Sequence, residues 1–81
     1  MFVALNRVVN NRERYYHISI FITLFGDFCI ERRYGAVKNK KPTKVIKEYY
    51  NSLIEAKKHY QKLFNAKISK GYKVTKTFNK I

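Results

Sequence analysis

The side chains with the clearest chemical potential are cations gathered around one tyrosine. Two arginines directly precede Tyr34, and four lysines follow it within ten residues. Lysine and arginine neutralise phosphates and release counterions, while a tyrosine ring stacks on a base or packs on a sugar. Lys73 and Lys76 would extend such a surface if the C-terminal segment lay beside it. We therefore expect a nucleic-acid-binding surface formed by Arg32, Arg33, Tyr34, Lys38, Lys40, Lys41 and Lys44, extended by Lys73 and Lys76.

The charge of the whole chain points the same way. Its 81 residues include 18 lysines and arginines against 5 acidic residues, a formal net charge of +13 at pH 7. A charge of this size needs a counterpart, and the phosphates of DNA or RNA are the partner typical of so basic a small domain. The alternative is a lysine-rich composition set by an AT-rich genome, which explains the lysines but not the scarcity of acidic residues.

Few side chains of this sequence could act together in catalysis. General acid–base catalysis needs two titratable groups held together in a water-poor pocket, and His17, His59 and the scattered carboxylates offer no such pair. No phosphate-binding glycine-rich loop, paired-histidine motif or serine elbow is present. The single Cys29 excludes an internal disulfide and a cysteine-based zinc cage. We therefore expect a protein that is not an enzyme, with no cofactor, no metal site and no small-molecule substrate.

Readout of specific bases is not expected. Such readout usually brings arginine, asparagine or glutamine into the major groove on a recognition element, and Asn39 is the only amide side chain in the basic loop. Contacts should go mainly to the phosphate backbone, which carries little sequence information. DNA is the preferred partner, while RNA, DNA ends and structured sites all stay open.

Length and composition predict one domain spanning residues 1–81. The hydrophobic fraction of 46% and the aromatic fraction of 16% are too high for a disordered chain. No run of 18 apolar residues is present, so no membrane span is expected. The first residues do not follow the pattern of a signal peptide. These features predict a cytoplasmic location, either on the nucleoid or within a nucleoprotein complex.

Alternating hydrophobicity predicts most of the secondary structure as strands. In the longest of these, one face carries Tyr16, Ile18, Ile20, Ile22 and Leu24, and this face is expected to lie on the core. Turns are expected at Asn10-Asn11-Arg12 and Gly26-Asp27, and a basic loop at Gly35–Thr43. The predicted strands are Phe2–Val9, Tyr15–Leu24, Phe28–Tyr34, Lys44–Tyr50 and, at a closing edge, Lys73–Phe78.

One helix is predicted after Tyr50. Ser52 and Glu55 have the spacing of a capping box, and Gly71 stands where a left-handed C-cap belongs. Between them an apolar stripe at helical spacing must pack on the sheet. The expected fold is therefore α+β, with a single small antiparallel sheet of four to five strands packed against one helix. The stripe consists of Leu53, Ala56, Tyr60, Leu63 and Phe64, and ends at Lys67.

From Arg14 to Tyr72 the order of these pieces resembles a WGR domain, a small module named for a Trp-Gly-Arg tripeptide. An aromatic strand, a hairpin and a basic strand precede the tripeptide, and a helix with an Ala-x-x-x-aromatic pattern follows it. In this chain the helix pattern reads Ala56-Lys57-Lys58-His59-Tyr60, and Gly71-Tyr72 matches the closing glycine–aromatic pair. The signature itself is Tyr34-Gly35-Ala36, so the aromatic and glycine positions remain while the arginine is replaced.

The resemblance implies nucleic-acid contact through Tyr34 and nearby cations. In DNA-dependent poly(ADP-ribose) polymerases, the family's tryptophan packs against the terminal sugar of a DNA break, and the arginine connects DNA binding to neighbouring domains. Gly35 is then expected in a turn with positive φ. The alternative function is an accessory subunit that contacts a protein partner within a larger nucleic-acid-processing complex. Phe21, Tyr49 and Tyr50 favour that alternative, because not all of them fit a core built on one sheet.

Overall fold

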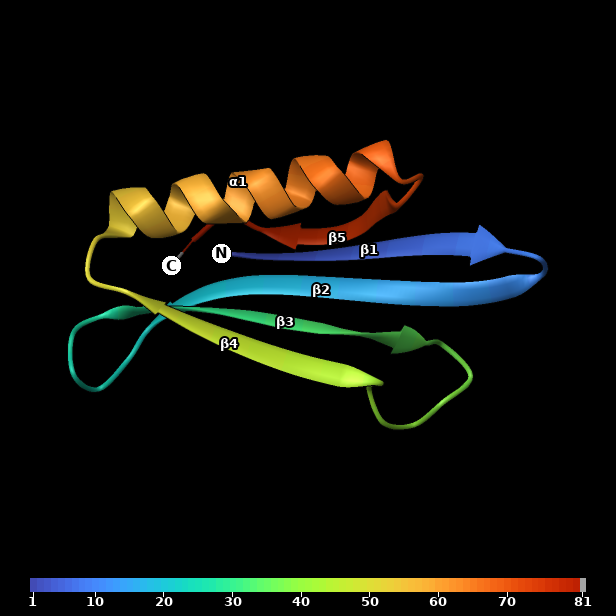
Figure 1. Ribbon diagram of the computed structural model, residues 1–81, viewed down its shortest axis with the longest axis horizontal. Helices are drawn as coiled ribbons and strands as arrows, with labels where there is room; N and C mark the ends of the chain where they lie inside the picture. Colours follow the sequence, from blue (N-terminus) through green and yellow to red (C-terminus); the bar gives the residue numbers. More distant parts are fainter. Residues whose placement is uncertain (81) are drawn as a thin grey trace.

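A five-stranded antiparallel sheet and one helix make up the computed structural model, which describes residues 1–80 (Figure 1). The strand order is β4-β3-β2-β1-β5, so β4 and β5 form the two edges. The helix lies against one face of the sheet, which confirms the predicted α+β fold. The elements are β1 (Phe2–Val9), β2 (Arg12–Ile22), β3 (Phe28–Ala36), β4 (Lys44–Tyr50), α1 (Leu53–Ser69) and β5 (Lys73–Phe78).

The core lies between α1 and the middle of the sheet. Leu5, Ile18 and Ile30 are fully buried on the face that α1 covers, with Ala56 and Tyr60 packed on them from the helix. The predicted core face of β2 is confirmed at Tyr16, Ile18 and Ile20. It is wrong at its far end, where 58% of Ile22 and 102% of Leu24 are exposed. The β2–β3 connection projects beyond the first turn of α1 (Figure 1), so the helix cannot cover these two side chains.

A two-residue turn at Asn10-Asn11 joins β1 to β2. Both residues have positive φ, 52° and 63°, a conformation that asparagine tolerates and that matches the twist of a hairpin. Val9 therefore pairs with Arg12, and β2 begins three residues earlier than the predicted Tyr15. This extension adds a charged segment to the strand.

The structure contradicts the positive φ expected at Gly35. This glycine lies inside β3 and does not have a positive φ; among residues 1–80 the glycines with positive φ are Gly26 and Gly71. A Cβ at Gly35 would lie 2.8 Å from the backbone nitrogen of Thr43. Glycine is required here because the returning loop packs directly on the strand, not because of the backbone conformation.

The structure shows the Ser52 half of the predicted capping box and the predicted glycine C-cap. The Ser52 hydroxyl accepts a hydrogen bond from the Glu55 N–H at 3.4 Å. At the other end Gly71 has φ 97°, its N–H donates to Ile68 and the Tyr72 N–H donates to the Lys67 carbonyl, both at about 3 Å. This motif turns the chain sharply and fixes Tyr72 beside the end of the helix. Within residues 1–80, no helix is long and apolar enough to cross a membrane.

Candidate nucleic-acid interface

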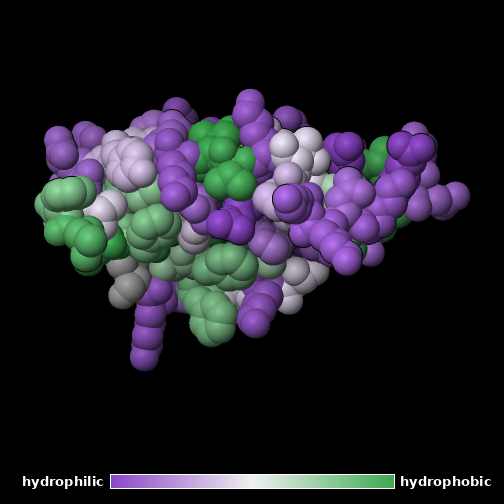
Figure 2. Space-filling model, turned by 90° about the horizontal axis from the view of Figure 1, so that it is seen from below, coloured by the Kyte–Doolittle hydropathy of each residue, from purple (hydrophilic) through white to green (hydrophobic). Residues whose placement is uncertain are grey.

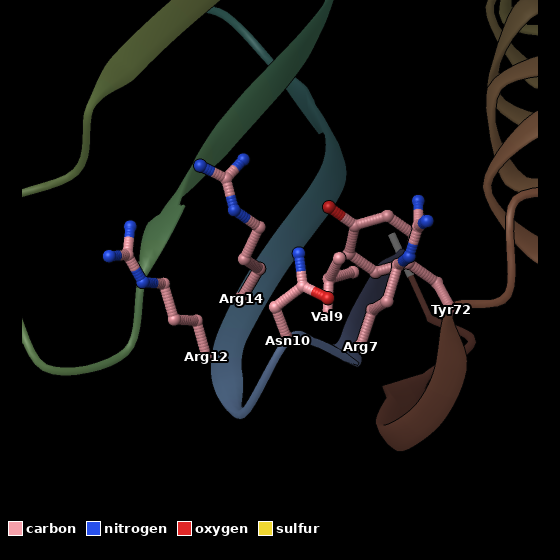
Figure 3. Close-up of a pocket in the computed structure, with 6 residues that line it drawn as sticks. All are labelled: Arg7, Val9, Asn10, Arg12, Arg14 and Tyr72. Carbon is pink, nitrogen blue, oxygen red and sulfur yellow. The ribbon is translucent and has the colours of Figure 1, made fainter.

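Three arginines from the β1–β2 hairpin gather on the same side of the sheet as α1, beyond the end of the helix (Figure 3). The strand register pairs Arg7 with Arg14 and Val9 with Arg12, so all four side chains share one face. Tyr72 closes the side nearest the helix, and its hydroxyl points across the hairpin toward Arg14. The resulting open cavity, of about 590 Å³, is lined by Arg7, Val9, Asn10, Arg12, Arg14 and Tyr72, and we call it the arginine pocket.

The arginine pocket concentrates positive charge without neutralising it. Arg7 and Arg14 stand directly opposite each other, and like charges in that position destabilise a sheet. The ion pairs found in residues 1–80 join Arg32, Arg33 and Lys47 to glutamates, and none of them involves a pocket arginine. A phosphate placed between these guanidinium groups would remove the repulsion and accept charge-assisted hydrogen bonds.

A series of contacts between rings links the pocket to the core. The Arg7 guanidinium lies over the Tyr72 ring at 5.8 Å, and Tyr72 meets Tyr16 edge-on at 6.0 Å. Tyr16 in turn stacks flat on Tyr34, with ring centres 5.1 Å apart and planes 4° apart. Lys67 covers the same Tyr16 ring at 4.3 Å, and its burial, with repulsion from nearby cations, lowers its pKa. Tyr34 is therefore partly buried, with one face of its ring covered by Tyr16.

The predicted arginines of β3 are occupied. Arg32 lies on the helix side, where its guanidinium is 3.0 Å from Glu48 and donates to the Tyr16 hydroxyl at 3.4 Å. Arg33 lies on the opposite face, 3.1 Å from Glu31. These two side chains point away from each other, because successive residues of a strand alternate between faces. Arg32 shares the face of Tyr34, whereas Arg33 does not.

The predicted lysines fall into two groups on either side of the arginine pocket. The β3–β4 loop exposes Lys38, Lys40 and Lys41, and Lys44 begins β4. Lys73 and Lys76 lie on β5, which pairs with β1 at the opposite edge of the sheet. The C-terminal segment is therefore not beside the loop, since β1 and β2 separate the two groups. Lys73 starts its strand near the pocket, whereas Lys76 is further along it.

Apart from Lys76, these lysines and the pocket arginines lie at one end of the elongated molecule. Four of the five acidic residues, Asp27, Glu31, Glu48 and Glu55, lie toward the other end, in the β2–β3 turn, β3, β4 and the first turn of α1. Hydrophilic side chains cover one end of the view in Figure 2, and hydrophobic ones gather at the other. We call the first the basic end; it comprises Arg7, Arg12, Arg14, Lys38, Lys40, Lys41, Lys44, Lys70 and Lys73.

Sequence reasoning missed Arg7, Arg12, Arg14 and Tyr72. The signal that could have found them was the two-residue turn at Asn10-Asn11. Once that turn is set as a two-residue hairpin, its register places Arg7 opposite Arg14. Tyr72 follows from the helix C-cap, because the residue after a left-handed glycine folds back toward the last helical turn.

A strongly basic sheet-and-helix module with unpaired arginines at one end has the features of a nucleic-acid-binding domain. The family model of the WGR domain matches residues 1–79, and the chain belongs to that family. WGR domains are generally nucleic-acid-binding and typically non-catalytic. Comparisons with curated proteins and with solved structures return no significant match. Within residues 1–80, no cluster of three or more metal-ligating side chains is present.

Proposed function

We propose that this protein is a non-catalytic nucleic-acid-binding module that holds the phosphate backbone at its basic end. The observation that carries the proposal is the pairing of Arg7 opposite Arg14, with Arg12 beside them and no carboxylate of residues 1–80 bound to any of the three. Such an arrangement costs stability in the free protein. It is explained if the pocket takes an anionic ligand.

The pocket suits phosphate contact better than base readout. Guanidinium groups bind phosphate oxygens in pairs, and Tyr72 offers a ring and a hydroxyl at the rim. The loop lysines on one side and Lys73 on the other would follow the backbone as it leaves the pocket. DNA is the preferred ligand, with weak dependence on sequence and an open preference for ends or structured sites. A place on the nucleoid or within a nucleoprotein complex in the cytoplasm follows from this role.

The second candidate function is that of an accessory subunit that contacts a protein within a nucleic-acid-processing complex. The exposed Phe21 and Tyr49 favour it, because 40% and 59% of their surfaces lie open on the sheet. Tyr50 does not, since it packs against the core. The two functions are compatible, because these aromatics lie away from the basic end.

The test is a binding series on labelled blunt duplex DNA, closed-end hairpin duplex, single-stranded DNA and RNA at increasing salt. If about five phosphates are engaged on a duplex, log K should fall with log salt with a slope near −4.5. A change of Arg7, Arg12 and Arg14 together to Gln should lower affinity by about 100-fold and reduce the slope by about 3. A salt-independent affinity would refute the proposal.

The matched control changes Lys57, Lys58 and Lys62 to Gln. These lysines are exposed on the outer side of α1, so their substitution removes the same charge from a different surface. Their loss should weaken binding far less than the loss of the three arginines. Equal losses from both triple variants would mean that net charge alone binds the ligand and that the arginine pocket is not the site.

A further inference from the structure

The end opposite the arginine pocket carries a cluster of large apolar side chains open to solvent. Leu24 and Phe25 are almost fully exposed, at 102% and 95%, and Ile22 and Tyr49 are more than half exposed. Together with Phe21 they surround an open cavity of about 410 Å³. Figure 2 shows hydrophobic side chains gathered at one end of the molecule. We call this cluster the apolar end; it consists of Phe21, Ile22, Leu24, Phe25 and Tyr49.

The apolar end is large enough to be a binding surface. A whole aromatic side chain presents about 200 Å², so these five residues expose on the order of 700 Å² per copy. That is comparable with the largest apolar patch on a typical monomer, about 300–600 Å², which is often functional. Two such surfaces joined would bury about 1,400 Å² in total, within the lower part of the range for specific interfaces.

The charges in the cavity indicate what covers it. The cavity has one acidic and one basic side chain on its wall, Asp27 and Lys47. In a two-fold interface each contact occurs twice with the partners exchanged. Asp27 of one copy can therefore meet Lys47 of the second copy, and Lys47 of the first can meet Asp27 of the second. The Lys47 side chain is 51% exposed, and Glu31, 3.7 Å from its ammonium group, leaves it accessible.

We propose that the apolar end is the interface of a two-fold homodimer. The net charge of +13 opposes this arrangement only weakly. Lys47, Lys57 and Lys58 lie toward the apolar end among four of the five acidic residues, while half of the lysines and arginines, nine of 18, lie at the other end of a molecule 42 Å long. That separation is several times the screening length of about 8 Å at physiological salt. An anionic membrane is a poorer occupant, since Asp27 lies on the wall of the cavity and would face its headgroups.

Such a dimer would carry its two basic ends on opposite sides. If the proposed function is correct, one dimer therefore binds two nucleic-acid segments, and the second contact gains from effective concentration when both lie on one molecule. Only this consequence depends on the proposed function. The dimer itself is tested without nucleic acid.

The first experiment is sedimentation equilibrium of the full chain over a wide range of concentration. A dimer with a micromolar Kd is expected, because an interface of this size lies near the lower limit for stable association. Changing Leu24 and Phe25 together to Ser should raise Kd by about 100-fold, roughly tenfold for each lost side chain. The control is Ile68→Ser, which removes an isoleucine that is 42% exposed near the far end of α1 and should leave Kd unchanged.

The second experiment exchanges the charges. Asp27→Lys and Lys47→Asp should each raise Kd, and the double variant should restore it toward the wild-type value. The two single variants, mixed, should form a heterodimer. All variants should keep the circular dichroism spectrum and the nucleic-acid affinity measured at concentrations where the protein is monomeric.

Three results would overturn the proposal: a wild-type chain that stays monomeric, a dimer that survives Leu24→Ser with Phe25→Ser, or a double charge exchange that restores nothing. Binding of the monomer to lipid vesicles or to an unrelated protein through Leu24 and Phe25, with no self-association, would also overturn it. Loss of nucleic-acid binding in the arginine variant leaves the dimer intact, so the two proposals fail separately.

Discussion

The two ends of this small sheet depart from stable packing in opposite ways. At the basic end, Arg7 faces Arg14 across the hairpin, and no ion pair within the described residues joins either of them to a carboxylate. At the apolar end, Leu24 and Phe25 stand in water with nothing covering them. Stability comes from the middle, where residues such as Leu5 and Ile18 are fully buried beneath α1. A domain of this size can maintain two unsatisfied surfaces if one compact core separates them.

Aromatic rings at the two ends should respond differently to truncation. Tyr34→Ala removes a ring stacked on Tyr16 and packed on the core, and should lower the free energy of unfolding by about 3 kcal/mol. Phe25→Ala removes a ring that is 95% exposed and should change it by less than about 0.5 kcal/mol in the monomer. Urea denaturation at low protein concentration measures both. Similar losses at the two positions would contradict the comparison.

The stacked position of Tyr34 limits which of its variants can be used in the nucleic-acid test. Because Tyr34→Ala is expected to disturb the fold, a fall in DNA affinity in that variant would not show that Tyr34 contacts DNA. Tyr34→Phe keeps the stacked ring and tests the contribution of the hydroxyl. Tyr72→Phe, at the rim of the arginine pocket, removes a hydroxyl that is placed to reach a phosphate.

The glycines of the two ends differ in the reason for their presence. Gly35→Ala brings a Cβ to 2.8 Å from the backbone of Thr43 and should cost about 2 kcal/mol, because backbone atoms must move. Gly26→Ala meets no atom within 4 Å but must adopt φ +85°, which should cost about 1 kcal/mol. Thermal or urea unfolding ranks the two. If Gly26→Ala lowered the free energy of unfolding more than Gly35→Ala, steric crowding would not be the main reason for glycine at position 35.

The repulsion at the basic end should appear as a stability gain when it is removed. Arg14→Gln is expected to raise the free energy of unfolding by about 0.5 kcal/mol at low salt, because Arg7 loses a like charge directly opposite it. The gain should shrink at high salt, where the charges are screened. Lys47→Gln serves as the control, since Lys47 lies near Glu31 and its loss should give no gain. Unfolding curves at two salt concentrations provide the measurement, and a loss of stability in Arg14→Gln would argue against repulsion.

The smallest expected effect is a pH dependence from His17 on the open face of the sheet. Burial and the nearby Arg33 lower the pKa of His17 below its ordinary value of 6.5. The unfolded chain therefore takes up a proton more readily than the folded protein, and stability should fall as the pH drops below about 6.5. His17→Gln should flatten this part of the profile. Urea unfolding at pH 7.5 and below pH 6 checks it, and an unchanged slope would assign the pH dependence to another group.

Local patterns predicted most of the fold. The bounds of β1, β4 and β5 coincide with the predicted strands, and the caps at Ser52 and Gly71 form as expected. Strand periodicity and helix caps depend on a few neighbouring residues, so a single sequence is enough to predict them. The start of β2 was missed because Arg12 and Arg14 have no strand preference of their own. They are extended only because the Asn10-Asn11 turn pairs them with β1.

The candidate site was predicted only in part, because it is assembled from distant segments. The loop lysines are exposed as expected, but Arg32 and Arg33 turn to opposite faces, and both pair with glutamates. Tyr34 finds a partner in Tyr16, eighteen residues earlier, and the pocket joins Arg7 to Tyr72 across most of the chain. Contacts of this kind follow from strand register and helix termination together, which no short motif encodes.

The pairing of the first strand with the last has a consequence for how the molecule is made. Phe2 lies opposite Phe78, so the contact that completes the sheet spans almost the whole chain. Long-range strand pairing is slow, since a large loop must close before the contact forms. During synthesis β1 can join β2 early, yet its other edge stays open until β5 has emerged. Folding of this domain should therefore finish only after nearly all of it has left the ribosome, with an unpaired edge exposed in the interval.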